Sequence, residues 1–442
     1  MASPTTAASS SAASADSELI EWLGQAGGSC SSGVRIGENS GERGLFATKD
    51  APANAMLLFV PADLHIRAPA IADMYDVERE DDRLALTLLR AAFGSRTRKR
   101  WRPWIHSLPG SEYTTPLHWK NAAIALLGDE EFISSVERQQ VRLRQRYDAL
   151  VSHLQRHDSA SEWPAGREER LGLGRDIFGL SFETYRWAYA TIRSRAAYLD
   201  EETEGARQAI VPVGDLFNHS TTAPNVAAAY ALPARAYVYT ALQPIAAGDE
   251  LLVSYGAHDN ATLLKHYGFV PRGPNPHDRV AVALDDAADD GRLATGAAAR
   301  AWLAEQGFDA GHALTHDGPS FELLAALRLR HATDDEYRNG AAFAIAEGEA
   351  VSDANEARVW RAVGDLARAL ARPPSEAEDD RRRIDALHQQ PNVEAGEAHE
   401  LLAREFRAAR AALVEANVAR AEREARERDG EGGGKRRRTQ AH

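Results

Sequence analysis

The order of strand-like and helix-like segments is the feature that most constrains the fold of this chain. From residue 34 to 66, short apolar runs such as MLLFVP alternate with turn residues, which predicts short strands. From 71 to 191 apolar residues recur every three or four positions, which predicts helices, and strand-like runs return between 210 and 253. After PRGPNP at 271–276 the chain is again helical, to about residue 428. Because strands do not alternate one by one with helices, the pattern predicts an α+β fold rather than a doubly wound parallel sheet.

The same order sets the expected domain boundaries. Residues 18–272 are expected to form a domain of short strands, split by a helical insertion at about 67–205, and residues 278–428 an all-helical domain. Residues 1–17 are low in complexity and offer little that could pack against a core, so we expect them to be disordered. The basic end of the chain, 429–442, is expected to be a flexible, solvated tail, with a nuclear import signal as the alternative.

Composition excludes several classes of protein. Cys30 is the only cysteine in 442 residues, so the chain cannot form an internal disulfide, a cysteine-rich zinc module or a four-cysteine iron–sulfur cluster. The formal net charge of −13 argues against a protein whose whole surface binds nucleic acid.

No stretch has the roughly 18 consecutive apolar residues of a membrane span, and the start of the chain has no apolar block for secretion. We therefore expect a protein of the cytoplasm, the nucleus or both, with no membrane or direct nucleic-acid partner. The Ala-, Ser- and Thr-rich start leaves the plastid as the alternative, which its acidic residues weaken.

The common cofactor and catalytic motifs are absent from the sequence. The glycines of GLGRDIFG at 172–179 have the wrong spacing for a dinucleotide loop, and Lys435 is not followed by the Ser or Thr of a phosphate loop. Neither HExxH nor GxSxG occurs. We therefore expect no metal centre and no serine nucleophile.

Three separated segments remain as candidates for a site: GERGLFATKD at 41–50, VPVGDLFNHS at 211–220 and GDELLVSYGAHDNATLLKHYGFVP at 248–271. Each has a purely structural explanation when it is taken alone. Gly41 and Gly44 could be hairpin glycines. The polar and aromatic residues could be turn, cap or core residues: Asp215, Asn218, His219, Ser220 and Tyr255.

Taken together and in this order, the three segments resemble the SET-domain methyltransferases. RKRWRPWIHSLPGSEYTTPLHW at 98–119 is similar to a segment of the Rubisco large-subunit methyltransferase branch, and FELLAALRLR at 321–330 is more loosely similar to its substrate-binding domain. The resemblance covers about residues 18–430 and is strongest from 41 to 269. It implies a split domain of short strands with a helical insertion, followed by a helical domain that binds the substrate. A chain with one cysteine matches the branch that closes its site with helices, not the enzymes flanked by cysteine-rich zinc modules.

The resemblance implies methyl transfer from S-adenosylmethionine, with Tyr255 as the catalytic residue and no metal. Tyr255 would position the amine and the methyl group as a neutral phenol, since a pKa near 10 leaves it protonated at neutral pH. The backbone of Gly41, Glu42 and Arg43 would meet the amino group of the cofactor, and Arg195 its carboxylate, unless Arg195 forms only a surface salt bridge. The family pattern assigns the rest of the cofactor site to a threaded loop and an adenine-stacking segment: Asp215, Asn218 and His219, and Tyr267, Gly268 and Phe269.

Two departures from the family pattern bear on the acceptor. Ala197 and Gly214 stand where many relatives carry larger side chains, so the substrate channel is expected to be wider. The lack of a hydrogen-bonding group at Ala197 favours lysine over histidine, which one branch of the family methylates.

The primary prediction is a protein-lysine N-methyltransferase that acts, as a monomer, on a non-histone protein docked by the C-terminal domain. Acidic residues of that domain favour a basic substrate segment. The alternatives are protein-histidine methylation and a non-catalytic SET-like binding module, and Tyr255 and Arg195 argue against the second.

Overall fold

The computed structural model divides into two compact units, which are described separately. The first contains the chain up to residue 257, and the second contains most of the chain from 272 onward. Two short segments of the later chain, 262–271 and 394–399, belong to the first unit, and 258–261 belongs to the second. The structure describes residues 4–39, 41–94, 98–110, 113–156, 180–199, 207–284, 296–390 and 393–431.

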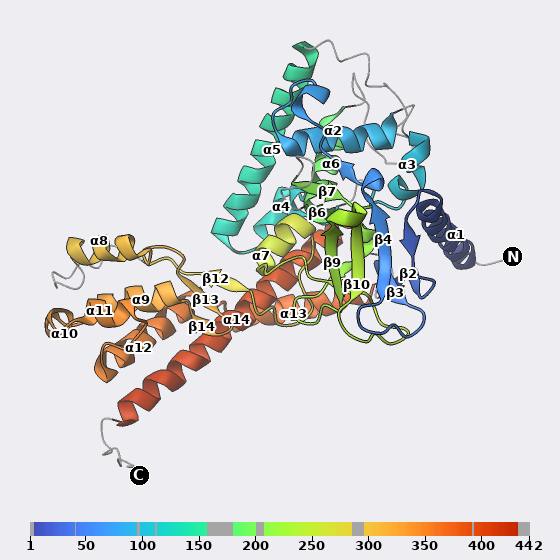
Figure 1. The fold of residues 1–442 in the computed structure, drawn as a ribbon. Coiled ribbons are helices and arrows are strands. Elements are labelled where there is room, and N and C mark those ends of the chain that lie inside the picture. The colour runs from blue at the N-terminus through green and yellow to red at the C-terminus, as the bar shows by residue number, and fades with distance from the viewer. Residues whose placement is uncertain are drawn as a thin grey trace. The chain divides into compact units, whose positions relative to one another are not determined.

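The strands of the first unit come from both sides of the helical insertion. In the antiparallel sheet of order β1-β4-β10-β9, β4 lies against β10 with Phe59 opposite Val238 (Figure 1). β5 and β7 also pair across the insertion, with Ile66 opposite Ile210. The two sets of strands therefore form one folded unit, as the α+β prediction requires. The strands of this unit are β1 (Ser29–Cys30), β2 (Val34–Asn39), β3 (Glu42–Ala47), β4 (Met56–Pro61), β5 (Ile66–Arg67), β6 (Ala196–Tyr198), β7 (Gln208–Ile210), β8 (Asn218–His219), β9 (Val226–Ala231), β10 (Ala236–Ala241) and β11 (Leu252–Val253).

The insertion is helical, as the spacing of its apolar residues predicted. Leu84, Leu88 and Leu89 lie on one helix and are completely or almost completely buried. The last helix of the insertion is capped by Ser181, whose hydroxyl oxygen accepts a hydrogen bond from the Thr184 N–H at 3.0 Å. This cap fixes the start of the helix and therefore the position of its C-terminal residue, Arg195. The helices are α2 (Glu80–Phe93), α3 (Arg98–Ile105), α4 (Asn121–Ala125), α5 (Glu130–Arg156) and α6 (Phe182–Arg195).

The N-terminal segment differs from its prediction. Residues 4–17 were expected to be disordered, but they lie in helix α1 (Pro4–Gln25). Alanine has the highest helix propensity of all residues, and this segment is rich in it. The end of the helix is also tied down by packing, because Leu19 and Leu23 are completely buried.

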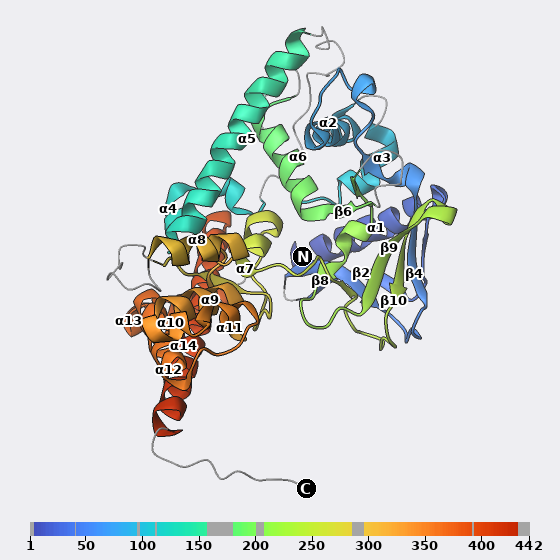
Figure 2. The same cartoon turned by 60° about the vertical axis from the view of Figure 1, so that its left-hand side comes forward.

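The second unit is mainly helical, which confirms the predicted fold class. Phe406 and Leu413, two of the apolar residues that predicted the last long helix, are buried in it. A small antiparallel sheet, which the sequence did not predict, joins the helices: β12 (Arg279–Ala281), β13 (Ala313–Thr315) and β14 (Gly318–Pro319). The helices are α8 (Ala297–Gln306), α9 (Phe321–Arg330), α10 (Asp334–Arg338), α11 (Ala341–Ala346), α12 (Asp353–Leu370), α13 (Pro374–His388) and α14 (Ala395–Glu431) (Figure 2).

The predicted basic tail falls mostly outside the described residues, which stop at 431. Its first three residues, 429–431, continue helix α14 instead of forming a flexible segment. Among the helices that the structure describes, none combines the length and the apolar character needed to cross a membrane.

Candidate active site

Tyr255 lies just after β11, and its hydroxyl is bound by the chain that leads into β8. These two short strands are parallel neighbours, with Leu252 opposite Asn218. The Tyr255 hydroxyl donates a hydrogen bond to the backbone carbonyl of Phe217 at 2.6 Å. Burial raises the pKa of Tyr255 above its ordinary value, and the nearby Arg195 only partly opposes this. The hydroxyl therefore stays protonated at neutral pH and, with its hydrogen committed, can serve a further group only as an acceptor.

An aromatic cluster surrounds Tyr255 and unites four residues predicted for the site. The Tyr255 ring stacks on His219 and on Tyr267, with a centroid distance of 5.0 Å in both cases. Phe269 meets Tyr255 edge-on at 6.5 Å. Gly268 joins the cluster with a φ of 83°, and a Cβ at this position would lie only 2.4 Å from the nearest side-chain atom. This position therefore requires glycine on both conformational and steric grounds.

His219 is held as a neutral imidazole. Its Nδ1 accepts a hydrogen bond from the backbone N–H of Tyr255 at 2.9 Å, and its Nε2 lies 3.1 Å from the Thr221 hydroxyl. A backbone N–H can only donate, so Nδ1 carries no proton and the ring proton is on Nε2. The side chain thus fixes both the backbone and the ring of Tyr255.

Arg195, at the end of α6, pairs with Asp215. Its Nη1 donates to Asp215 Oδ2 at 3.0 Å and to the backbone carbonyl of the same residue at 2.9 Å. The Asp215 side chain is completely buried, and its other oxygen accepts a hydrogen bond from Trp104 Nε1 at 3.1 Å. Burial disfavours the charged form of Arg195, but Asp215, Tyr113 and Tyr255 together outweigh it and raise the Arg195 pKa. Arg195 is therefore a fixed cation, held by Asp215, the residue predicted to support the threaded loop.

Asn218 connects β8 to the β2–β3 hairpin. Its side-chain amide donates to the backbone carbonyl of Arg43 at 3.2 Å and to Glu250 Oε1 at 2.8 Å. The Arg43 guanidinium is engaged elsewhere, with Asp16 at 2.5 Å and the Ser107 carbonyl at 2.9 Å. The main chain of Arg43, and not its side chain, is thus the part that contacts Asn218.

Glycine occupies positions 41 and 44 of this hairpin for different structural reasons. Gly41 adopts a φ of 85° at the turn, with open space around its missing side chain, and Glu42 follows as an exposed residue of β3. Gly44 is needed for close packing, because a Cβ there would lie 2.7 Å from Asn218 Nδ2 and 2.8 Å from Glu250 Oε1. The hairpin explanation therefore accounts for Gly41, whereas Gly44 lets β3 approach the site.

Gly214 leaves no open space where its side chain is missing. A Cβ at Gly214 would lie 2.2 Å from the hydroxyl of Tyr239, so this buried tyrosine fills the space of the missing side chain. Tyr239 stacks on Phe217 at 4.5 Å, with the ring planes 9° apart. Ala197 lies half-buried in β6, opposite Ala209 of β7.

Several residues of the site escaped the sequence analysis. Glu250 lies in the quoted segment 248–271, and Tyr239 lies in the strand-like stretch between 210 and 253, but nothing in their spacing assigned them a partner. Trp104 and Tyr113 both lie in the segment 98–119, and they contact Asp215 and Thr191 only after the insertion has folded. No group of three or more His, Cys, Asp or Glu side chains in the described part of the chain is arranged to hold a metal ion.

Comparison with protein families now separates the two parts of the chain. The SET domain model matches residues 42–256, and the Rubisco LSMT substrate-binding model matches residues 297–415. The chain carries a SET domain followed by a Rubisco LSMT substrate-binding domain.

The relatives of this SET-domain protein include named enzymes. It is 27% identical over 374 residues to the actin-histidine N-methyltransferase of Rattus norvegicus, and 28% identical over 374 residues to that of Dasypus novemcinctus. The match covers 80% of this chain in both cases, but only 60% and 61% of those two relatives. The chain thus spans about three fifths of the length of these curated relatives.

Solved structures share the fold of both parts. The SET domain of LSMT bound to lysine and AdoHcy superimposes with a TM-score of 0.63 at 21% identity, over 94% of this chain and 92% of that one. Rubisco LSMT bound to AdoMet gives a TM-score of 0.62 at 19% identity, over 94% and 93% of the two chains.

Proposed function

We propose that this SET-domain protein transfers a methyl group from S-adenosylmethionine to the side-chain amine of a lysine in a non-histone protein. The observation that carries the proposal is the state of Tyr255. It is a protonated phenol, stacked between His219 and Tyr267, and its hydroxyl hydrogen is committed to a backbone carbonyl. Such a group cannot act as a proton-abstracting base at neutral pH, but it can accept a hydrogen bond from an amine and orient it.

The residues of the site fit S-adenosylmethionine. Arg195 Nε is buried and has no partner among the described residues, so this fixed guanidinium retains a donor that a carboxylate could accept from. Phe269 offers an aromatic face beside the cluster, as the predicted adenine contact requires. When bound, the cofactor supplies a methyl group on a positively charged sulfur. The contributions of the protein are to orient the acceptor nitrogen and to exclude water.

A lysine acceptor must be presented without its proton. With a reference pKa of about 10.4, neutralising lysine at pH 7 costs about 4.6 kcal/mol. Burial of the ammonium among aromatic rings reduces this cost because it disfavours the charged form. The aromatic cluster around Tyr255 supplies such surroundings, and its hydroxyl oxygen supplies the acceptor that orients the neutral amine.

Protein-histidine methylation is the second candidate, and a specific observation favours it. The relatives that match along 80% of the chain are named actin-histidine N-methyltransferases. A histidine acceptor is largely neutral at pH 7, so it would not need the desolvation that lysine requires. The small side chain of Ala197 supplies no hydrogen bond for an imidazole, which is the argument for lysine.

The second unit is proposed to dock the protein substrate. Its match to a Rubisco LSMT substrate-binding domain supports this role. We propose further that the protein acts as a monomer in the cytoplasm, the nucleus or both.

The experiment that tests the proposed function is methyl transfer from labelled S-adenosylmethionine to proteins of a cell extract. Transfer by the wild type should fall about 100-fold or more in Tyr255→Phe, which keeps the stacked ring but removes the group that orients the amine. Calorimetry should show that the variant still binds S-adenosylmethionine. Tyr230→Phe is the matched control, because the buried Tyr230 hydroxyl has no partner among the described residues.

Mass spectrometry of the labelled protein then separates lysine from histidine as the acceptor. If the wild type neither binds the cofactor nor transfers the label, the chain is a binding module and the enzymatic proposal is rejected.

A further inference from the structure

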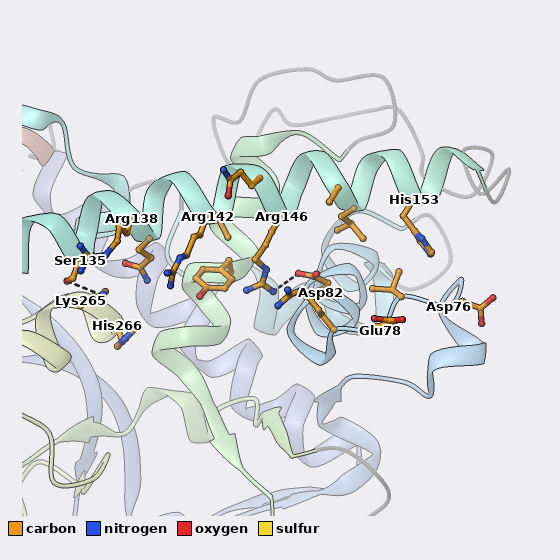
Figure 3. Close-up of a pocket in the computed structure, with 18 of the residues that line it drawn as sticks. Asp76, Glu78, Asp82, Ser135, Arg138, Arg142, Arg146, His153, Lys265 and His266 are labelled. Atoms are coloured by element: carbon orange, nitrogen blue, oxygen red, sulfur yellow. Dashed lines mark hydrogen bonds and ion pairs between the residues drawn. The ribbon is translucent and has the colours of Figure 1, made fainter. Parts of the chain in front are cut away.

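A groove of about 1040 Å³ runs along helix α5 in the first unit, apart from the cluster around Tyr255 (Figure 3). Its walls are α5, the segment that leads into α2, Tyr189 of α6, and the two residues Lys265 and His266. Lys265 and His266 immediately precede Tyr267, whose ring stacks on Tyr255. One end of the groove is therefore close along the chain to the candidate active site.

At one end of the groove the charged residues are all cations, whereas the other end carries both signs, because Arg79, next to Glu78 in the chain, and Arg156, at the end of α5, also line it. Figure 3 shows Arg138, Arg142 and Lys265 at one end, and Asp76 and Glu78 at the other. Both acidic side chains belong to exposed residues. Positive charge without neighbouring acidic residues is therefore confined to the end with Arg138, Arg142 and Lys265.

The cationic end lacks compensating carboxylates. Arg146, in the middle of the groove, pairs with Asp82 at 2.6 Å. Arg138, Arg142 and Lys265, in contrast, have no ion pair with any carboxylate in the described part of the chain. The Lys265 ammonium is bound by a hydroxyl instead, which is that of Ser135 at 3.1 Å.

The electrostatic effect of this arrangement is visible at Lys265. Burial lowers its pKa, and the neighbouring Arg138, Arg142 and Arg193 lower it further. Arg193 Nε is itself buried without a partner among the described residues. Cations that converge in a chain of net charge −13 repel one another, and an anionic ligand would remove that cost.

The spacing of the arginines suits an extended peptide. Arg138 and Arg142 are four residues apart, which is about 6 Å along the helix axis. Alternate residues of an extended chain are about 6.6 Å apart and point to the same side. Flexible arginine side chains span the small difference, so carboxylates on alternate residues can meet successive arginines.

A peptide fits the groove better than a nucleic acid. A nucleic acid strand is negative along its whole length, so a chain of net charge −13 would repel the parts of it that extend beyond this short cationic stretch. A polypeptide can place acidic residues against Arg138 and Arg142, and neutral residues against the part of the groove that carries both signs.

We propose that this groove binds an extended, acidic segment of a protein partner, with carboxylates on alternate residues facing Arg138, Arg142 and Lys265. The interaction goes beyond the proposed methyl transfer and requires no cofactor. It also differs from the basic substrate segment expected for the second unit, because a different surface is involved.

The test is direct binding of a labelled peptide to the full chain, followed by fluorescence anisotropy. The probe is a ten-residue peptide of alternating serine and aspartate, and the comparison peptide alternates serine and asparagine. The acidic peptide should bind in low salt and weaken as the salt concentration rises, and the neutral peptide should not bind. Arg138→Glu combined with Arg142→Glu should weaken the acidic peptide about tenfold or more, since two attractions become repulsions.

Lys99→Glu combined with Arg102→Glu is the matched control. It makes the same change in charge at exposed residues of α3, a helix that does not line the groove, so binding should stay within about twofold of the wild type. Equal loss in both double variants would mean that only net charge matters, and it would overturn the proposal. Unchanged binding of the acidic peptide by the groove variant would also overturn the proposal. The same holds if millimolar inorganic phosphate, or an oligonucleotide that binds more tightly, displaces the peptide completely. Because no methyl transfer is measured, failure here leaves the proposed function standing, and an inactive chain that binds the peptide rejects only the proposed function.

Discussion

Replacing Asp215 with asparagine tests the charge arrangement on which the candidate site is built. The substitution keeps the size of the side chain but removes the negative charge that faces Arg195 at 3.0 Å. The Asp215 side chain is completely buried, and that of Arg195 is 20% exposed, so water cannot replace the lost partner fully. An isosteric amide can still accept the hydrogen bond from Trp104, which isolates the effect of the charge.

The magnitude follows from what remains for Arg195. Removing one partner of a buried ion pair costs about 3–5 kcal/mol, because the other charge is left uncompensated. Arg195 keeps its hydrogen bond to the backbone carbonyl of residue 215, so we expect the lower end of this range, about 3 kcal/mol. Urea-induced unfolding of the first unit measures this loss, and calorimetry measures the accompanying loss of S-adenosylmethionine binding.

Asp148→Asn is the matched control for this substitution. Asp148 pairs with Arg144 at 3.4 Å on the surface of α5, with both side chains more than half exposed. Such a pair contributes little, and its loss should change the free energy of unfolding by less than about 0.5 kcal/mol. If Asp215→Asn were as stable as this control and bound the cofactor like the wild type, the reasoning about the Arg195 pair would be refuted.

Two further substitutions test the packing and the pH dependence of the first unit. Gly44→Ala should push apart Asn218 and Glu250, which should lower the free energy of unfolding by about 1–3 kcal/mol and weaken cofactor binding. Gly110→Ala is the control, because a Cβ there would lie in open space and should change stability and binding little. Equal urea midpoints for the two variants would contradict this prediction. Burial, with smaller contributions from Arg186 and His399, lowers the pKa of His118 to about 3. The folded state therefore resists protonation of His118, and stability is lost as the pH falls below about 6.5, the pKa of histidine in the unfolded chain. Between pH 6.5 and 5 the wild type should lose about 1–2 kcal/mol more than His118→Gln, and parallel urea midpoints for the two proteins across this range would rule the mechanism out.

The sequence predicted the elements of the fold better than their partners. Hydrophobic spacing located the insertion and the late helices, because one face of a helix repeats locally along the chain. The pairing of β4 with β10 joins residues nearly 180 positions apart, and no local pattern encodes it. The small sheet of the second unit was missed for a related reason, since strands of two or three residues carry almost no periodicity.

The same limit applies to the candidate site, where contacts join several of the predicted residues but were not foreseen from the sequence. Arg195 was singled out as a partner for a carboxylate of the cofactor, yet the chain supplies its own carboxylate, Asp215, and holds that carboxylate with Trp104 from the insertion. This arrangement changes what the arginine can do. Nη1 is committed to Asp215, and Nε is buried without a partner among the described residues, so the guanidinium is oriented and charged before any ligand arrives. A pre-oriented donor binds a carboxylate without first losing side-chain freedom, and the ion pair with Asp215 thereby links the stability of the fold to the affinity of the site.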